Sequence, residues 1–455
     1  MLRSRARRSP WISAAAAAAI ATFVAACGPN TGRDDGDGGG SGDGGTIDGP
    51  PPCVNLECLQ VTCPGGGTTR LTGTIYTPRG DLPLPNVTVY VPNADLLPLP
   101  EGVTCERCDG FISGAPLVRT VSDVDGSFAL DNVPVGSNIP LVIQTGKWRR
   151  LVTVPGTDAC VDNFVSPDLT RLPRNKSEGN LPRIALTTGG ADAVECLLRK
   201  VGIDDSEFTR EEGTGRVNFY NGRSGSSAFA ASLGGQSFTA APTFWDSLAG
   251  LSPYDVVLHS CEGFNDANNK SANARQALMD YTALGGRVFM SHYHNWWLRS
   301  GPAPWPTLTS SWRDECCPSG PITVTINTAF DRGRQLADWL LLTGASTVLG
   351  QIPVVNPRAT MTDVNTSLGE LWATGSPSGT VRPQYVAFNT PLSAPEEERC
   401  GRVVFSDLHV SGGSGRDTPG QAFPNGCTTT DLLPQEKALI YMFFDITGCI
   451  DPPIP

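Results

Sequence analysis

A chain of 455 residues, 39% of them hydrophobic, is long enough for more than one folded domain. Its net charge is −11 and no basic patch stands out, which excludes nucleic acid as an expected partner. The 14 cysteines bear on the compartment of the protein, because disulfides form and persist mainly outside the cytoplasm.

Residues 1–26 predict an export signal. Arginines crowd the first eight residues, and the apolar run 11–26 is too short to span a membrane but has the length of a signal-peptide core. The run ends in "FVAAC", whose small residues before Cys27 resemble the lipobox of bacterial lipoproteins. That resemblance implies a lipid at Cys27 and a place in the bacterial cell envelope, facing periplasm or exterior. The alternative is an ordinary secretory signal with a chance cysteine.

Residues 27–52 are rich in Gly and Asp and hold almost nothing that can bury apolar surface, so we expect a disordered tether. Loss of residues 1–26 removes four arginines and no acidic residue, which changes the net charge from −11 to −15. An exported chain uses most cysteines in disulfides, and zinc at the Cys105–Cys108 pair is less expected there. Lipid at Cys27 leaves an odd number of cysteines, so at least one thiol is unpaired.

Residues 53–165 predict a small β-sandwich. Short β-branched runs such as "RLTGTIYTP" and "NVTVYVPN" alternate with Pro and Gly, and Asp125-Gly126 suits a tight hairpin turn. Together with "TVSDVDGSFALDNVPVG", these stretches resemble the carboxypeptidase regulatory-like domain, a transthyretin-like sandwich. The resemblance implies a spacing or binding module without catalysis. The insertion 93–117, which carries Cys105 and Cys108, is expected to be a disulfide-pinned loop.

Polar residues 166–180 predict a linker, and residues 181–455 predict a doubly wound, flavodoxin-like α/β domain. Buried-strand patterns alternate with helical stripes, which is typical of a mostly parallel sheet covered on both faces. The expected strands are "RIALTTGG", "YDVVLHSC", "GRVFMSH" and "GRVVFSDLH". The expected helices are "ADAVECLLRKVG", 272–284 and a last one that begins at Pro434.

This order resembles the class I glutamine amidotransferase-like fold and, within it, the ThuA-like branch. The resemblance rests on "YDVVLHS", "LGGRVFMSHYH" and the late "GRVVFSDLH". Amidotransferases carry a nucleophilic Cys in a Gly-flanked turn after the strand that begins here at Arg287. This chain has Ser291, His292 and Tyr293 there, so glutaminase activity is not expected.

All four histidines of the chain follow predicted strands of this domain. The carboxyl ends of parallel strands meet at one edge, where α/β proteins bind ligands. Imidazoles with a carboxylate could hold zinc or another divalent metal, or act as acid and base. The alternative is that each imidazole is satisfied by backbone carbonyls. The candidate metal ligands are His259, His292, His294, Asp407 and His409.

Two further features have a chemical and a plain interpretation. Cys261 follows a strand beside His259 and is a candidate nucleophile, with His292 and His294 as catalytic partners, although most cysteines of exported proteins are paired or buried. Trp296, Trp297 and Trp305 crowd a Pro-rich segment, where they could stack on sugar rings or fill space under a loop.

Two functions therefore stand side by side. The first, which we favour, is a non-catalytic, lipid-anchored envelope protein whose α/β domain binds a ligand, with an envelope glycan or a protein as partner. The second is a hydrolase, acting on saccharide, that uses the histidines with or without a metal. Convergent imidazoles around one site favour the second, whereas imidazoles satisfied singly by backbone groups favour the first.

Overall fold

The computed structural model describes residues 53–105, 107, 110–315, 320–410 and 416–448. The predicted signal peptide, Cys27 and the tether lie outside these residues. Within the described ranges, no helix combines the length and the apolar character needed to cross a membrane.

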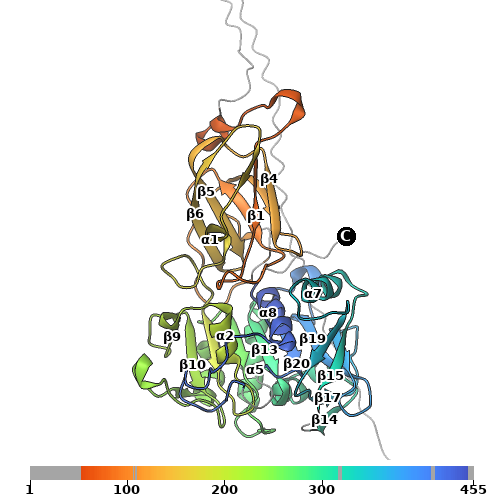
Figure 1. The fold of residues 1–455 in the computed structure, drawn as a ribbon. Helices are drawn as coiled ribbons and strands as arrows, with labels where there is room; N and C mark the ends of the chain where they lie inside the picture. The colour runs from red at the N-terminus through yellow and green to blue at the C-terminus, as the bar shows by residue number, and fades with distance from the viewer. Residues whose placement is uncertain (1–52, 106, 108–109, 316–319, 411–415, 449–455) are drawn as a thin grey trace, which may run out of the picture. The chain divides into compact units, whose positions relative to one another are not determined.

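Residues 70–164 form two small sheets (Figure 1). The antiparallel sheet has the strand order β3-β2-β5-β6, and the other has the order β4-β1-β7, with β7 parallel to β1. Val89 of the first sheet and Leu71 and Phe128 of the second belong to one buried cluster. The strands are β1 (Arg70–Thr74), β2 (Thr88–Pro92), β3 (Pro116–Val121), β4 (Ser127–Asp131), β5 (Gly136–Thr145), β6 (Trp148–Thr157) and β7 (Asp162–Phe164). The sandwich assignment and its family stay predictions.

The Asp125-Gly126 turn differs from the expected hairpin. It joins β3 to β4, which pair with different neighbours in different sheets. Gly126 has a φ of 75°, and a Cβ there would lie 2.6 Å from the carbonyl oxygen of Ile75. The glycine is therefore needed for a close approach to the backbone that follows β1, the neighbour of β4 in the same sheet, rather than for a two-residue hairpin.

Disulfides join Cys53 to Cys58, Cys63 to Cys160, Cys105 to Cys400 and Cys196 to Cys427. The 93–117 loop is pinned by a disulfide as expected, but Cys105 reaches a partner 295 residues away. Lys147, just before β6, forms a buried ion pair with Asp255. The expected linker 166–180 contains α1 (Pro167–Thr170). Within it, Arg171 donates two hydrogen bonds to the Glu178 carboxylate in a bidentate ion pair.

The second part is built on one mixed sheet of 11 strands, β11-β10-β8-β12-β13-β20-β19-β18-β15-β16, with β9 beside β10. From β11 to β20 the strands are parallel, and from β20 to β16 they are antiparallel. The antiparallel half, which the sequence patterns did not reveal, makes the sheet less parallel than expected. The strands of the whole sheet are β8 (Ile184–Thr187), β9 (Phe208–Thr209), β10 (Val217–Asn221), β11 (Thr239–Ala240), β12 (Val256–His259), β13 (Arg287–Ser291), β15 (Ile322–Ile326), β16 (Gln351–Val354), β18 (Glu370–Gly375), β19 (Arg382–Thr390) and β20 (Gly401–Ser406). Two further strands, β14 (Trp312–Glu315) and β17 (Ala359–Met361), pair only with each other.

Helices cover both faces of the parallel half. Along β12, Val256 and Leu258 belong to the cluster that includes residues of α2 and α8, whereas Val257 belongs to the cluster with residues of α3 and α5. Side chains of a strand alternate between faces, so the two clusters mark the two sides of the sheet. The helices are α2 (Val194–Val201), α3 (Ala241–Trp245), α4 (Leu248–Leu251), α5 (Ala272–Ala283), α6 (Trp296–Arg299), α7 (Asp331–Leu342) and α8 (Pro434–Thr447).

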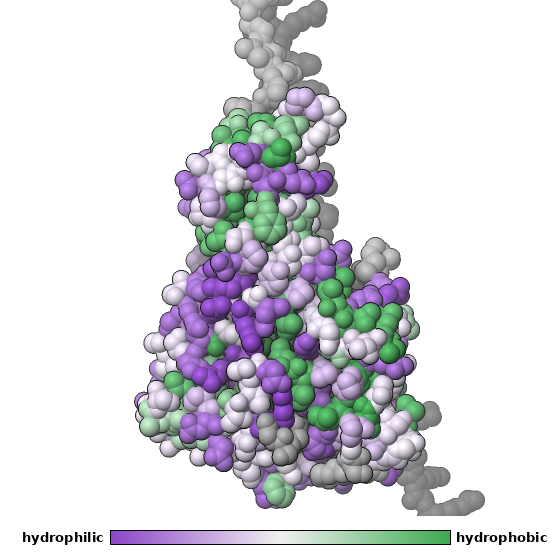
Figure 2. All heavy atoms as spheres, in the orientation of Figure 1, coloured by the Kyte–Doolittle hydropathy of each residue, from purple (hydrophilic) through white to green (hydrophobic). Residues whose placement is uncertain are grey.

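The face in Figure 2 mixes polar and apolar residues, with apolar ones gathered on the side of α7. Leu341 and Leu342 end α7, and Val348 and Leu349 follow it; each is at least 41% exposed. All four histidines, in contrast, are at most 1% exposed. The candidate chemistry therefore lies inside the α/β part.

Candidate metal-binding site

Three adjacent parallel strands deliver the histidines to one edge of the sheet. β12 ends at His259, His292 follows the last residue of β13, and His409 lies just after β20. The order β12-β13-β20 places these ends side by side. The structure divides the four imidazoles into two pairs with different surroundings.

The first pair gathers around a thiol. One ligand atom each from Cys261, His292 and His409 lies within 4.8 Å of the other two. The Cys261 sulfur is 3.4 Å from Nδ1 of His292, and the His292 and His409 ring centroids are 5.2 Å apart. A tetrahedral zinc ion with bonds near 2.3 Å to sulfur and 2.0–2.1 Å to nitrogen separates two such ligand atoms by about 3.5 Å. The arrangement, called the Cys-His-His cluster below, therefore fits a transition metal.

His292 has an unusual backbone. It follows β13 with a φ of 41° and begins a 3₁₀ turn over His292–Asn295. A residue other than Gly in this left-handed region costs on the order of 1–3 kcal/mol, and such strain collects at functional sites. This turn is where the amidotransferase resemblance expects a nucleophilic Cys, and the strained position here carries an imidazole instead.

Cys261 is a buried thiol and the free cysteine among the described residues. Its sulfur accepts a hydrogen bond from the backbone N–H of Gly263 at 3.4 Å. Burial nevertheless raises the pKa of the Cys261 thiol to about 12. Without a metal, this thiol is therefore protonated at neutral pH.

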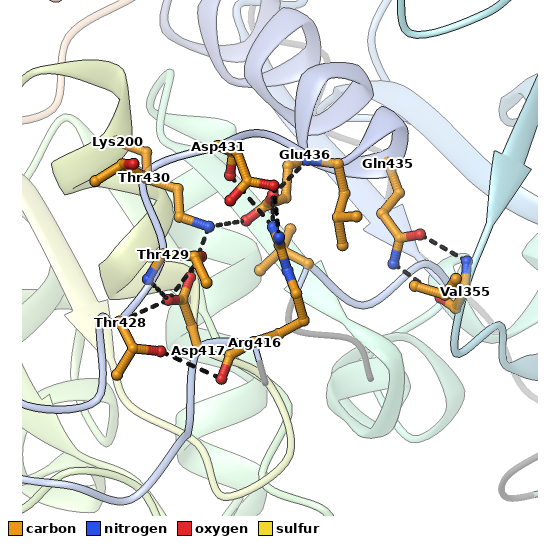
Figure 3. Close-up of polar contacts among 12 residues, drawn as sticks. Lys200, Val355, Arg416, Asp417, Thr428, Thr429, Thr430, Asp431, Gln435 and Glu436 are labelled. Carbon is orange, nitrogen blue, oxygen red and sulfur yellow. Dashed lines mark hydrogen bonds and ion pairs between the residues drawn. The ribbon is translucent and has the colours of Figure 1, made fainter. Parts of the chain in front are cut away.

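His409 has no hydrogen bond at either ring nitrogen within the described part of the chain. Burial, and then the charges of His292 and Arg358, lower its pKa well below the ordinary value, so the ring is neutral. Its backbone carbonyl accepts a hydrogen bond of 2.6 Å from Gln435, the second residue of α8. The same Gln435 side chain pairs with both backbone groups of Val355 at 2.8 Å, as Figure 3 shows. The ring is thus positioned by its backbone and left open for a ligand.

A buried ionic network holds the chain that follows the site. In Figure 3, Lys200 of α2 points toward Asp417 and Glu436, and Arg416 also reaches Glu436. The Lys200 nitrogen is 2.7 Å from Asp417 and 2.5 Å from Glu436. These pairs, with the Cys196–Cys427 disulfide, fix the return of the chain from the sheet edge to α8.

The second pair, His259 and His294, is called the stacked pair. Its rings are 4.7 Å apart and 18° from parallel. Nε2 of His294 donates to the carbonyl of Ser260 at 2.9 Å, and Nδ1 accepts from the Trp297 indole at 3.0 Å. Nδ1 of His259 lies 2.9 Å from the Thr187 hydroxyl. Both nitrogens of His294 are therefore occupied, and the predicted role of His294 as ligand or acid–base group has no geometric support.

A buried cation lies beside the stacked pair. Lys270 is fully buried, and its ammonium is 2.6 Å from the Glu262 carboxylate. The same ammonium lies 5.2 Å from the ring centroid of Trp245 and 5.7 Å from that of Trp297. Burial, followed by the Lys270 charge, lowers the pKa of His259 and of His294 well below the ordinary value. The Lys270 charge disfavours a second cation at the stacked pair.

Asp407 is outside the Cys-His-His cluster. Its carboxylate accepts hydrogen bonds from the backbone and hydroxyl of Thr360 at 2.8–3.0 Å. Burial raises the pKa of this carboxyl to about 7. Asp407 therefore serves as a neighbour of the site and not as a member of the group that gathers around one point.

The three tryptophans do not form an open platform. Trp297 and Trp305 are at most 1% exposed, and Trp297 stacks on His259. Trp296 is half-buried under the guanidinium of Arg299. Their plain interpretation, that they fill space beneath a long segment, accounts for Trp297 and Trp305.

Sequence patterns missed Arg358, which lies beside β20 and is 7% exposed. Its charge acts on Cys261, Asp192 and Asp407. It follows Pro357 in a segment with no strand alternation or motif, so no sequence signal pointed to it.

Comparison with known proteins gives remote likenesses. No family model matches the chain, and no curated protein does. A putative ThuA-like protein from Bacteroides uniformis is 11% identical over 58% of this chain and 90% of its own, with a TM-score of 0.32. Another from Parabacteroides merdae is 12% identical over 60% and 92%, also at 0.32. A type II cohesin–X-dockerin complex from Acetivibrio cellulolyticus is 13% identical over 30% and 85%, at 0.17. None of these values supports a functional transfer.

Proposed function

We propose that this chain is a lipid-anchored protein of the bacterial cell envelope. Its α/β part binds a divalent transition metal, for which zinc is the first candidate, and the metal in turn binds a ligand. The observation that carries the proposal is the gathering of Cys261, His292 and His409 ligand atoms within 4.8 Å in a buried site. Thiolate and imidazole are the donors that zinc prefers.

A metal accounts for the thiol better than nucleophilic catalysis does. Nucleophilic cysteines have a lowered pKa, because the thiolate is the reactive form. Burial raises the pKa of Cys261 to about 12, so little of the reactive thiolate is present even with His292 beside it as a general base. A coordinating metal deprotonates a thiol outright, which makes the same buried position favourable.

Three protein ligands leave one position of a tetrahedral ion for another molecule. Structural zinc sites close with four protein ligands, whereas catalytic sites keep three and bind water or substrate at the fourth. This ligand count favours a second candidate function, metal-assisted hydrolysis with a saccharide as substrate. Glutamine hydrolysis is not proposed, because the strained turn carries His292 in place of a thiol.

Metal analysis tests the proposal. The mature chain without its lipidated Cys27, residues 28–455, purified with its disulfides intact, should retain about one zinc per chain after removal of loosely bound ions, as a site with Kd well below micromolar does. Absence of stoichiometric zinc, cobalt, nickel or copper, both as purified and after reconstitution, contradicts the metal function.

The anchor has its own test. Two acyl chains hold a protein stably at a membrane, whereas a single acyl chain gives only weak, reversible binding. Cys27→Ser in the full chain should therefore move the protein from the membrane fraction to the soluble fraction. Unchanged membrane retention of Cys27→Ser contradicts the anchor without touching the metal function.

A further inference from the structure

Backbone contacts hold Arg358 beside the residues that follow the C-terminal end of β20. Its N–H donates to the carbonyl of Asp407 at 2.9 Å, and Pro357 forms an antiparallel bridge with Leu408. Arg358 and Thr360 are two residues apart on an extended segment, so their side chains share one side. Thr360 on that side contacts the Asp407 carboxylate. This register directs the Arg358 side chain toward the strand end that carries His409.

The guanidinium is buried but only partly used. Nη1 donates to the carbonyls of Asn356 and Pro357 and to the Asn356 side chain, at 2.8–3.1 Å. Nε and Nη2 make no hydrogen bond to a described residue, and no described carboxylate lies within ion-pair distance of Arg358. The Asp407 carboxylate contacts Thr360, and the Asp192 carboxylate accepts from Ser291 and from the backbone of Val410 at 2.8 and 2.9 Å.

A largely buried guanidinium without a carboxylate partner has lost most of its hydration, and a bound anion would replace it. Nε and Nη2 form the edge of the guanidinium that grips a planar oxyanion with two parallel hydrogen bonds. Electrostatic effects agree with this position: burial lowers the pKa of Arg358, while its interactions with Cys261, Asp192 and Asp407 act in the opposite direction. Arg358 thus lies within electrostatic reach of the Cys-His-His cluster.

We propose that Arg358 makes this a site for oxyanion ligands, namely small molecules bearing a carboxylate or phosphate group, which bind the Nε–Nη2 edge near the Cys-His-His cluster. The inference rests on the proposed function and adds the class of ligand. Acetamide has the shape of acetate without its charge, and it presents an NH₂ donor in place of one acceptor oxygen. It should therefore bind this edge more weakly than acetate does.

Calorimetric titration of the zinc-loaded mature chain tests this inference, with acetate, inorganic phosphate and acetamide as probes. Arg358→Gln should weaken the tighter of the two anions by about tenfold or more, the loss expected for charge-assisted hydrogen bonds. Arg358→Lys, which keeps the charge without the fork, should fall between. Arg70→Gln makes the same change of net charge in β1, where Arg70 pairs with Asp131, and should bind as the unaltered protein does. Which anion binds more tightly distinguishes a carboxylate ligand from a phosphate ligand.

The outcomes separate the two proposals. Unchanged zinc content in Arg358→Gln, with weakened anion binding, supports both. Equal anion affinity in the unaltered protein and Arg358→Gln, acetamide binding as tight as acetate, or no binding of either anion overturns the oxyanion site while leaving zinc binding intact. If the chain takes up no metal, the same titrations on the metal-free protein decide the inference: Arg358-dependent anion binding supports it, and its absence overturns it. The thermal unfolding midpoint of each variant shows that it is folded.

Discussion

The Cys-His-His cluster and the stacked pair occupy equivalent places in the fold and have opposite properties. Both follow the ends of neighbouring parallel strands, and both are buried. In the stacked pair, His294 has protein partners at both nitrogens and Lys270 supplies a positive charge nearby. In the cluster, His409 has no hydrogen-bond partner at its ring among the described residues, and a free thiol lies within reach.

The difference teaches that position at the edge of a sheet does not make an imidazole a ligand. A nitrogen that already donates to a carbonyl, as Nε2 of His294 does to Ser260, must lose that bond before it can coordinate. A neutral ring without partners pays a desolvation penalty that a bound metal would remove. The bonds already made by the His294 ring, more than its burial, therefore set it apart from His409, whereas Nε2 of His259 has no hydrogen-bond partner among the described residues.

The largest expected effect is loss of the metal. Cys261→Ser and His409→Asn each remove one of three ligands, so we expect zinc affinity to fall by more than the roughly 10–100-fold that loss of a supporting residue causes. Equilibrium competition with a chromogenic chelator measures it. His259→Asn, a substitution of the same kind in the stacked pair, should leave zinc affinity unchanged. A loss in His259→Asn equal to that in His409→Asn would erase the proposed distinction.

The second largest effect is on stability at the stacked pair. Lys270→Met leaves Glu262 buried without its cation, and removal of one partner of a buried ion pair costs about 3–5 kcal/mol. Denaturant unfolding should show this loss. Addition of Glu262→Gln to Lys270→Met should recover part of the lost free energy of unfolding. A cost below about 1 kcal/mol would mean that the pair is solvated like a surface ion pair.

Much of the frame around the site follows from sequence patterns. Strands β12, β13 and β20 and the start of α8 at Pro434 are where the apolar runs and helical stripes predict them. Local patterns suffice there, because buried parallel strands are continuous apolar runs and Pro suits the first turn of a helix. The antiparallel strands β15 to β19 alternate less clearly and escaped prediction.

The division of the histidines could not be predicted, because it depends on contacts between distant segments. Cys261 meets His292 only because β12 and β13 are neighbours and His292 adopts a left-handed backbone. Lys270 reaches the stacked pair from the loop before α5. Arg358 joins the site through a bridge between Pro357 and Leu408 that no local pattern encodes.

A smaller effect is expected in the pH dependence of metal binding. The pKa of the Cys261 thiol is raised to about 12, so zinc must displace its proton at every pH below that value. The pKa of His409 is lowered, so this ring has no proton to release above pH of about 6.5. Zinc affinity should therefore rise about tenfold per pH unit from about 6.5 to 8, with one proton released per ion. Calorimetry in buffers of different ionisation enthalpy counts that proton, and a count of zero contradicts coordination by Cys261.

The smallest effect concerns the backbone of His292, which has a φ of 41°. At ordinary positions, Gly lowers stability by roughly 0.5–1 kcal/mol relative to Ala, because glycine has more backbone freedom to lose on folding. At a left-handed position the order reverses, since Ala is strained there and Gly is not. We therefore expect His292→Gly to be more stable than His292→Ala by about 1 kcal/mol in denaturant unfolding of metal-free protein. His294, two residues on in the same turn and without a positive φ, is the matched control: His294→Gly should be less stable than His294→Ala. If both positions favour Ala, His292 is not strained and its backbone is no evidence for function. If only His292 favours Gly, the chain accepts a conformational cost at the residue that the strand order places beside Cys261. Such a cost is expected for a residue retained for binding rather than for folding.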